Sequence, residues 1–212
     1  MRWAAALVLL LPVACTGVPA NLPFTPPTYF AYRCETGPGF EVRLAEGGAL
    51  VLWDSRRAVL RQVPVASGAR YADGAGRILH LQGLGAAFET PDLSWRACRG
   101  QLADTPWRAA AVRGIDLRAV GNEPPWLLEV DFQREMRIVL DNGDTVLTGP
   151  PPDDDEGTIS LPISGHDARL TIVDDPCRDT MSGEVVERTV TLTLDGTIYR
   201  GCGKEMADPF AG

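Results

Sequence analysis

Two hydroxyl side chains that flank a turn are the residues most suited to specific contacts. In Ser67-Gly68-Ala69-Arg70-Tyr71 the Ser-Gly pair is a turn dipeptide, because glycine reaches backbone angles that a side chain forbids. Apolar, strand-like runs lie on both sides, so we expect the hydroxyls of Ser67 and Tyr71 to project from a loop tip. No neighbouring base would activate them as nucleophiles, but they can donate hydrogen bonds to an acidic group. The segment therefore predicts a binding loop rather than a catalytic one.

Other chemistry has little support in the sequence. His80 lies in an apolar run and His166 in a turn, and neither is accompanied by the Gly-x-Ser-x-Gly elbow of a serine hydrolase. The sequence has no Cys-x-x-Cys, its acidic run at residues 153–156 lacks the pattern of a calcium loop, and no phosphate-binding glycine loop is present. We therefore expect no enzyme activity, no metal and no cofactor. An enzymatic alternative would need Glu123 and Asp179 to share a pocket.

The N-terminus has the features of an export signal. A positive residue precedes an apolar stretch too short to span a bilayer, and Ala14-Cys15 resembles the cleavage box of bacterial lipoproteins. We expect residues 1–14 to be removed and Cys15 to be lipidated, with a plain signal peptide cut elsewhere as the alternative. Residues 15–31 are uncharged and proline-rich, which predicts an extended tether. Because the residue after Cys15 is not the aspartate typical of inner-membrane retention, we expect an outer-membrane anchor facing the periplasm.

Four cysteines remain if Cys15 is lipidated. Export to an oxidising compartment makes disulfide bonds the default for them. They fall into two local pairs, Cys34–Cys98 and Cys177–Cys202, one in each half of the chain. By the chain-entropy estimate, each bond would stabilise the fold by roughly 3–4 kcal/mol.

Both halves of the chain have the alternation of short β-strands. Phe40, Val42 and Leu44 alternate with polar residues in the first half, and Val190 and Leu192 alternate with threonines in the second. Turn clusters separate the runs, and no long helical period occurs. The sequence thus predicts an all-β fold of two small antiparallel domains. The expected domains are residues 32–103 and 104–212.

Charge is divided unevenly between these halves. Residues 32–100 carry nine arginines and seven acidic residues, a net charge of +2. Residues 101–212 carry ten basic and twenty-one acidic residues, a net charge of −11. This acidity disfavours nucleic acid as a partner. It would either attract a basic protein or keep the domain soluble.

Five short motifs follow one another in the first half, on both sides of the Ser-Gly-x-x-Tyr segment. They are Tyr32-Arg33-Cys34, Ser67-Gly68-Ala69-Arg70-Tyr71, Leu81-Gln82-Gly83, Ala86-Ala87-Phe88 and Trp95-Arg96-Ala97-Cys98. In this order they resemble the membrane-bound and periplasmic inhibitors of c-type lysozyme from Gram-negative bacteria, and the resemblance covers about residues 29–100.

The resemblance implies an eight-stranded antiparallel barrel, closed by a disulfide, whose loop enters the lysozyme cleft and contacts the catalytic carboxylates. Ser67 and Tyr71 would be the inserted residues and Gly68 would permit the turn. Gln82 stands where family members usually have lysine, so it offers a supporting hydrogen bond but no charge. Lysozyme would be the protein partner, and the lipid anchor would supply the membrane contact.

Two alternatives stay open for this half. The Ser67–Tyr71 segment is also compatible with an ordinary hairpin in which Tyr71 packs at a barrel rim. The chain as a whole is also compatible with an envelope binding or scaffold lipoprotein that has an inhibitor-like fold and another partner.

The second half resembles a domain of uncharacterised bacterial envelope lipoproteins, which implies only location and fold. The matching segments are residues 121–126, 177–183 and 199–203.

Overall fold

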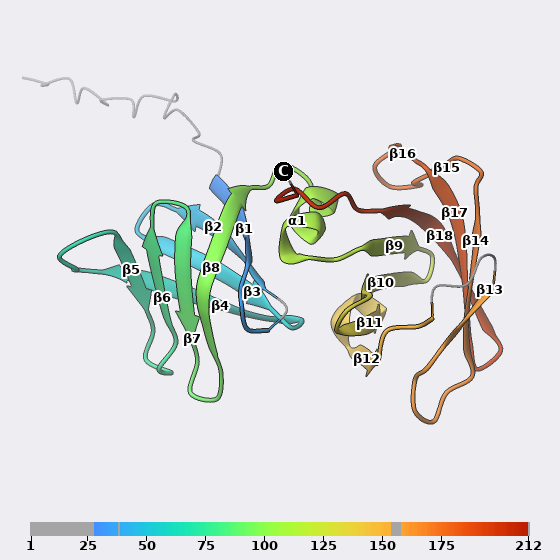
Figure 1. The fold of residues 1–212 in the computed structure, drawn as a ribbon, viewed down its shortest axis with the longest axis horizontal. Helices are drawn as coiled ribbons and strands as arrows, with labels where there is room; N and C mark the ends of the chain where they lie inside the picture. The colour runs from blue at the N-terminus through green and yellow to red at the C-terminus, as the bar shows by residue number, and fades with distance from the viewer. Residues whose placement is uncertain (1–27, 38, 154–157, 212) are drawn as a thin grey trace, which may run out of the picture.

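The computed structural model describes residues 28–37, 39–153 and 158–211. The predicted signal peptide, Cys15 and the tether up to residue 27 lie outside the described residues. Two β-sheet bodies lie side by side, with one short helix, α1, packed between them (Figure 1). The predicted all-β fold, with an eight-stranded barrel in its first half, is confirmed.

The first body is a closed antiparallel barrel in which each strand pairs with the next and β8 pairs with β1. Its strands are β1 (Thr28–Arg33), β2 (Phe40–Ala45), β3 (Gly48–Trp53), β4 (Arg56–Val63), β5 (Ala69–Ala72), β6 (Ile78–Gln82), β7 (Gly85–Glu89) and β8 (Ser94–Leu102). Because β1 and β5 are four places apart in both directions around this ring, they lie on opposite sides of the barrel.

Aromatic side chains fill the barrel. Phe40 stacks on Tyr32 with ring centroids 4.9 Å apart, and Phe88 packs against both Trp53 and Trp95 at 4.9 and 5.3 Å. Alternation along each strand directs these residues inward and leaves the intervening polar residues outside. The predicted Cys34–Cys98 disulfide is present and links the end of β1 to β8.

A short helix, α1 (Pro106–Arg113), connects the barrel to the second sheet. The hydroxyl of Thr105 accepts a hydrogen bond from the Arg108 amide at its start, and Gly114 ends it in the left-handed conformation. Its apolar face packs on β1 in a small cluster that includes Ala31, Ala109 and Val112. Helix α1 therefore attaches the second body to the β1 side of the barrel.

The second sheet has eight antiparallel strands in the order β12-β11-β10-β9-β18-β17-β14-β13. They are β9 (Leu117–Asn122), β10 (Pro125–Asp131), β11 (Glu135–Leu140), β12 (Thr145–Gly149), β13 (Thr158–Leu161), β14 (Ala168–Val173), β17 (Arg188–Leu194) and β18 (Thr197–Glu205), with a short helix η1 (Asp141–Gly143) after β11. The sheet curls around its own apolar core, so its two edge strands approach each other. Gly149, at the end of β12, lies so close to Pro162, just beyond β13, that a Cβ on Gly149 would be 2.6 Å from the Pro162 carbonyl oxygen. The sheet is therefore a second, nearly closed up-and-down barrel.

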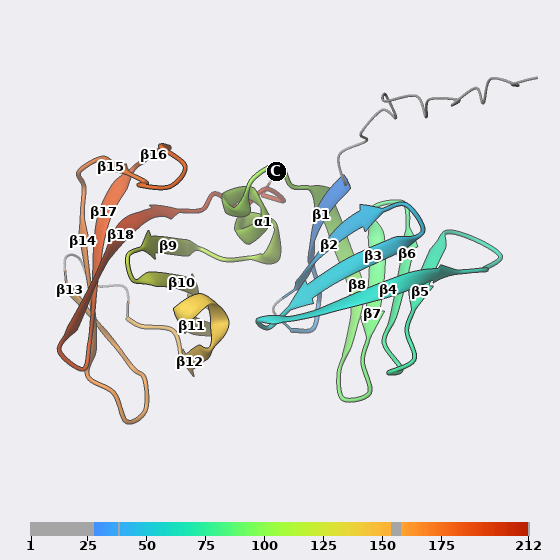
Figure 2. The ribbon, with the colours of Figure 1, turned by 180° about the vertical axis from the view of Figure 1, so that it is seen from behind.

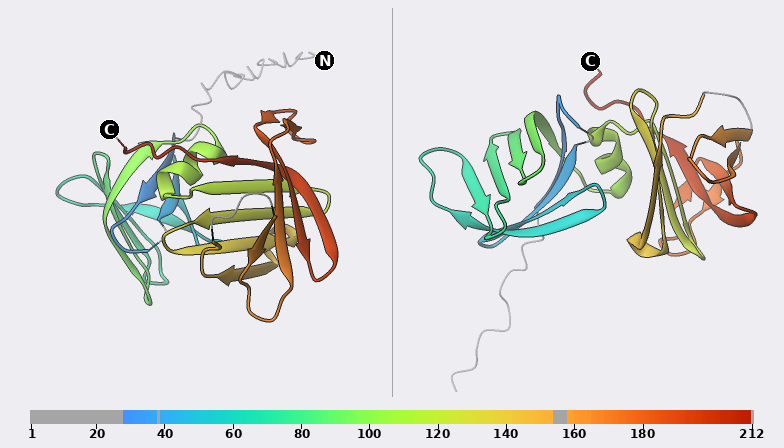
Figure 3. Two further views of the ribbon diagram at one scale, coloured as in Figure 1. Left: turned by 45° about the vertical axis from the view of Figure 1, so that its right-hand side comes forward. Right: turned by 90° about the horizontal axis from the view of Figure 1, so that it is seen from below.

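The C-terminal segment crosses back from β18 to the first barrel (Figure 2). The ring of Phe210 lies under two barrel guanidiniums, 5.1 Å from Arg33 and 4.7 Å from Arg99, and Arg33 also pairs with Asp208 at 2.9 Å. Figure 3 shows this segment beside α1 at the junction of the two bodies. The bodies are thus joined twice, by α1 before β9 and by the segment after β18, and these two strands are neighbours in the second sheet.

Candidate functional site

The Ser67–Gly68 turn lies in the β4–β5 loop, residues 64–68, with both residues exposed as the sequence predicts. Gly68 has φ +71°, and a Cβ there would lie 2.2 Å from the carbonyl oxygen of Leu81 on β6. Only glycine fits this close approach without displacing the backbone. The Nε2 atom of His80 lies 3.3 Å from the carbonyl oxygen of Ser67, so the loop rests against β6.

Tyr71 does not project from the loop tip, and this expectation is wrong. It is the third residue of β5, only 7% exposed, and packs in the barrel core. The strand already begins at Ala69, so alternation turns Tyr71 inward opposite Leu79. Burial, together with the neighbouring Tyr71, raises the pKa of Tyr32 to about 12. The alternative of an ordinary hairpin put Tyr71 at the barrel rim, and it agrees with the structure in that Tyr71 packs against the barrel, although the residue lies in the core itself.

Gln82 lies beside the Ser67–Gly68 turn. It ends β6, one residue beyond the Ala69–Leu81 pair, and is exposed. Two apolar side chains flank it on the same rim: Val65 is 41% exposed and Leu84 is 60% exposed. The rim thus presents exposed polar and apolar groups close to the Ser67–Gly68 turn.

The second sheet leaves this rim uncovered. The second body attaches at β1, whereas the β4–β5 loop leads into β5 on the opposite side of the ring. In Figures 1 and 2 the loop is the part of the barrel furthest from the second sheet. The additional domain therefore does not obstruct an approaching partner.

A buried ion cluster joins the two bodies and was not predicted from the sequence. We define the interdomain ion cluster as Arg113 of α1, Glu41 of β2, and Arg118, Glu129 and Arg137 of β9–β11. Arg113 donates to Glu41 at 2.9 Å and to both carboxylate oxygens of Glu129 at 3.0 and 2.6 Å. Arg118 also donates to Glu129, and Arg137 does so at 2.9 Å. Glu129, only 2% exposed, therefore interacts with three guanidiniums.

These contacts determine the protonation of the cluster. Burial alone would raise the pKa of Glu129, but the three arginines outweigh it and hold that pKa far below its usual range. The same attraction raises the pKa of Arg113 despite its burial. Burial and the hydrogen bond to Glu41 raise the pKa of Tyr29. In the sequence, the feature that could have indicated this cluster is Glu129, a charged residue between the apolar residues Leu128 and Val130, whose side chains face the core.

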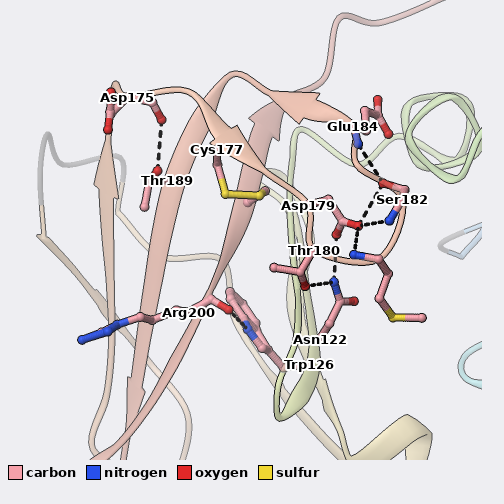
Figure 4. The surroundings of a disulfide bond; sticks show 12 residues. Asn122, Trp126, Asp175, Cys177, Asp179, Thr180, Ser182, Glu184, Thr189 and Arg200 are labelled. Atoms are coloured by element: carbon pink, nitrogen blue, oxygen red, sulfur yellow. Dashed lines mark hydrogen bonds between the residues drawn. A yellow bond between two sulfur atoms is a disulfide. The ribbon is translucent and has the colours of Figure 1, made fainter.

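The loop between β14 and β17 forms an arm fixed by the predicted Cys177–Cys202 disulfide (Figure 4). It contains the two-residue strands β15 (Cys177–Arg178) and β16 (Val185–Val186). Asp179 accepts hydrogen bonds from the Met181 and Ser182 amides and from the side chain of Asn122 at 3.0 Å. The hydrogen bonds from Ser182 and Asn122 lower the pKa of Asp179. These contacts make it an acceptor that shapes the loop.

The enzymatic alternative would require Glu123 and Asp179 to line one pocket. The two best-formed cavities among the described residues are lined by neither Glu123 nor Asp179. Within the described residues no group of three His, Cys, Asp or Glu side chains could hold a metal ion. The part of the chain covered by the structure also has no helix long and apolar enough to cross a membrane.

Comparison with known families finds a match, and it lies in the first barrel. Residues 32–92 match the family described as membrane-bound lysozyme-inhibitor of c-type lysozyme. The match spans the Ser67–Gly68 loop and Gln82 and supports a role as a lysozyme inhibitor, a non-catalytic function. Neither a curated protein nor a solved structure matches the chain.

Proposed function

We propose that the barrel, whose residues 32–92 match the lysozyme-inhibitor family, inhibits a c-type lysozyme by inserting its β4–β5 loop into the active-site cleft. The observation that carries this proposal is the exposed Ser67–Gly68 turn, held on a disulfide-bonded barrel and directed away from the second sheet. The protein acts by binding, without turnover.

Ser67 is the side chain that we assign to the catalytic groups. Lysozyme cleaves a glycosidic bond with one protonated and one ionised carboxyl group. A serine hydroxyl can donate to the carboxylate and accept from the protonated acid, and hydrogen bonds to a charged carboxylate are among the stronger ones. A loop in this position occupies the site without offering a bond that can be cleaved.

Gly68, Tyr71 and Gln82 have supporting roles in this proposal. Gly68 supplies the backbone angle that presents Ser67 at the tip. Tyr71 anchors the strand after the loop from inside the barrel, so it acts through the loop's position and not as an inserted hydroxyl. Gln82 offers a neutral hydrogen-bond donor beside Gly68, and Val65 and Leu84 offer apolar contacts.

A lysozyme assay with single-residue variants tests this mechanism. Removing the Ser67 hydroxyl from a charge-assisted hydrogen bond should cost about 1.5–3 kcal/mol, so we expect Ser67→Ala to weaken inhibition roughly tenfold or more. Ser94→Ala is the matched control, because Ser94 is exposed at the opposite end of the same barrel.

Potent inhibition by Ser67→Ala would overturn the loop mechanism. A wild-type protein without effect on any c-type lysozyme would instead favour the alternative, an envelope binding protein with an inhibitor-like fold and another partner.

The cellular location forms part of the same proposal. Residues 1–14 act as a signal peptide, Cys15 carries the lipid, residues 15–31 are the tether, and domains 32–103 and 104–212 face the periplasm from the outer membrane. The membrane-bound character of the family supports an envelope location. Labelled palmitate should be incorporated by the wild type and not by Cys15→Ser. Equal labelling of both proteins would refute the anchor at Cys15.

A further inference from the structure

A cleft of about 580 Å³ lies between the barrel and the second sheet. One wall is the β3–β4 hairpin, residues 52–57, and the other is the outer face of β10 and β11 with the turn at residues 142–144. The hairpin points toward that turn in Figures 1 and 2, whereas the Ser67 loop lies at the far side of the barrel. The cleft volume is typical of sites for small ligands.

The free charges of the two walls have opposite signs. Arg56 and Arg57 extend from the hairpin, and Glu135 and Asp144 from the other wall. All four are exposed, and none has an ion-pair partner within the ranges that the structure describes. Asp54 also lines the hairpin side, which leaves that wall with one net positive charge against two negative charges opposite. An electrostatic field therefore runs across the cleft, from the positive hairpin wall to the negative wall opposite.

The floor of the cleft is the interdomain ion cluster, which has three guanidiniums for two carboxylates. The Nε atom of Arg118 is buried without a hydrogen-bond partner among the described residues. Arg137 lines the cleft with its side chain 20% exposed, and only its Nη2 atom contacts Glu129. The floor therefore retains positive charge and unused N–H donors.

Between the charged groups the cleft is apolar. Leu127 of β10 and Val139 of β11 pair across the two strands on the face that carries Glu129 and Arg137, and both line the cleft. Leu52 lines it from the barrel. A ligand here would meet an apolar strip with opposite charges at its two sides.

We propose that this cleft binds a short peptide with free ends. Its carboxylate would lie at Arg56 and Arg57 with Arg137 beneath, its ammonium at Glu135 and Asp144, and an apolar side chain on the strip between them. A simple anion would face the two acids, and a simple cation would face the arginines, so a dipolar ligand matches both walls. Because the ion cluster and the C-terminal segment already fix the two bodies, the walls need little rearrangement to bind it.

Titration of the full mature protein with three forms of one tripeptide tests the proposal. The probes are Ala-Leu-Ala with free ends, the same peptide N-acetylated, and the same peptide amidated at its C-terminus. We expect the free form to bind and each cap to weaken binding roughly two- to fivefold, because each removes one exposed charge contact. Isothermal titration calorimetry gives the affinities, and amide shifts in NMR should locate the peptide at Leu127 and Val139.

Two charge-reversal variants complete the test. Arg57→Glu should weaken binding of the free peptide about fivefold or more, whereas Arg61→Glu, on the same strand and face but outside the cleft, should not. Both variants should inhibit lysozyme like the wild type. If Arg57→Glu loses both lysozyme inhibition and its thermal unfolding transition, the variant is misfolded and its loss of peptide binding has that cause.

Equal affinity for all three peptides, no binding at millimolar concentration, or equal behaviour of the two folded variants would overturn the proposal. The capped peptides need no variant, so they decide the question even if Arg57→Glu does not fold.

Discussion

Among single residues of the loop, Gly68 is the one whose substitution should disturb the loop most. Gly68 and Gly47 both have φ +71° and both lie at turns of the first barrel. A Cβ on Gly47 would meet nothing within 4 Å, whereas one on Gly68 would collide with the carbonyl oxygen of Leu81 at 2.2 Å. A comparison of alanine variants at the two positions therefore distinguishes the free-energy penalty of the backbone angle from the penalty of the steric clash.

Alanine substitutions at these two glycines should differ in a defined way. Gly47→Ala should lower the free energy of unfolding by the left-handed penalty alone, about 1–2 kcal/mol, and leave lysozyme inhibition unchanged. Gly68→Ala should lower it further and also weaken inhibition, because the loop must move away from β6. Urea unfolding and the lysozyme assay measure the two effects. Equal losses for both variants would show that the contact with β6 does not determine the loop's position.

The residues of the loop also show where sequence reasoning succeeds and fails. Ser67 and Gly68 were predicted at the tip because a Ser-Gly turn is a local signal, and the structure has them exposed there. Tyr71 was misplaced, because the sequence alone does not reveal that the strand starts at Ala69. The role of Glu129 was not predicted, since no local pattern shows that three arginines from α1, β9 and β11 converge on it.

At the level of elements, two predictions that rested on local patterns are confirmed, the all-β fold and the pairing of four cysteines. Alternation along strands predicted the all-β fold, and cysteine spacing predicted the disulfides Cys34–Cys98 and Cys177–Cys202. Helix α1 was missed because eight residues give too little periodicity, although Thr105-Pro106 and Gly114 are recognisable capping residues. The strand order of the second sheet depends on long-range pairings such as β9 with β18, which no local pattern encodes.

For the whole molecule, the interdomain ion cluster makes the two bodies depend on each other. Replacing Glu129 by glutamine removes the buried countercharge of three arginines, one buried and two half-buried, so we expect the free energy of unfolding at pH 7 to fall by about 3–5 kcal/mol. Glu46→Gln is the control, because Glu46 is exposed in a turn of the first barrel. Urea unfolding of the two variants and the wild type measures the difference.

The same carboxylate predicts a pH dependence. The pKa of Glu129 is lower in the folded protein than in the unfolded chain, so its contribution is complete above the ordinary glutamate value of about 4.3 and declines as the pH falls below it. The stability gap between wild type and Glu129→Gln should therefore narrow between pH 5 and pH 2, as unfolding curves at several pH values would show. A gap that stays constant in acid would contradict this account of the cluster.

The direction of the barrel strands has a consequence for how the protein meets its target. Strands alternate in direction around the ring, so Thr28, where β1 starts, lies on the same rim as residues 64–68. A molecule held at a surface through residues upstream of Thr28 would therefore turn the rim that carries Ser67 toward that surface. The distance between the rim and the surface would then determine whether a lysozyme can reach the loop. A surface-held copy would bind only lysozyme that fits into this gap, whereas a released copy would bind lysozyme in solution.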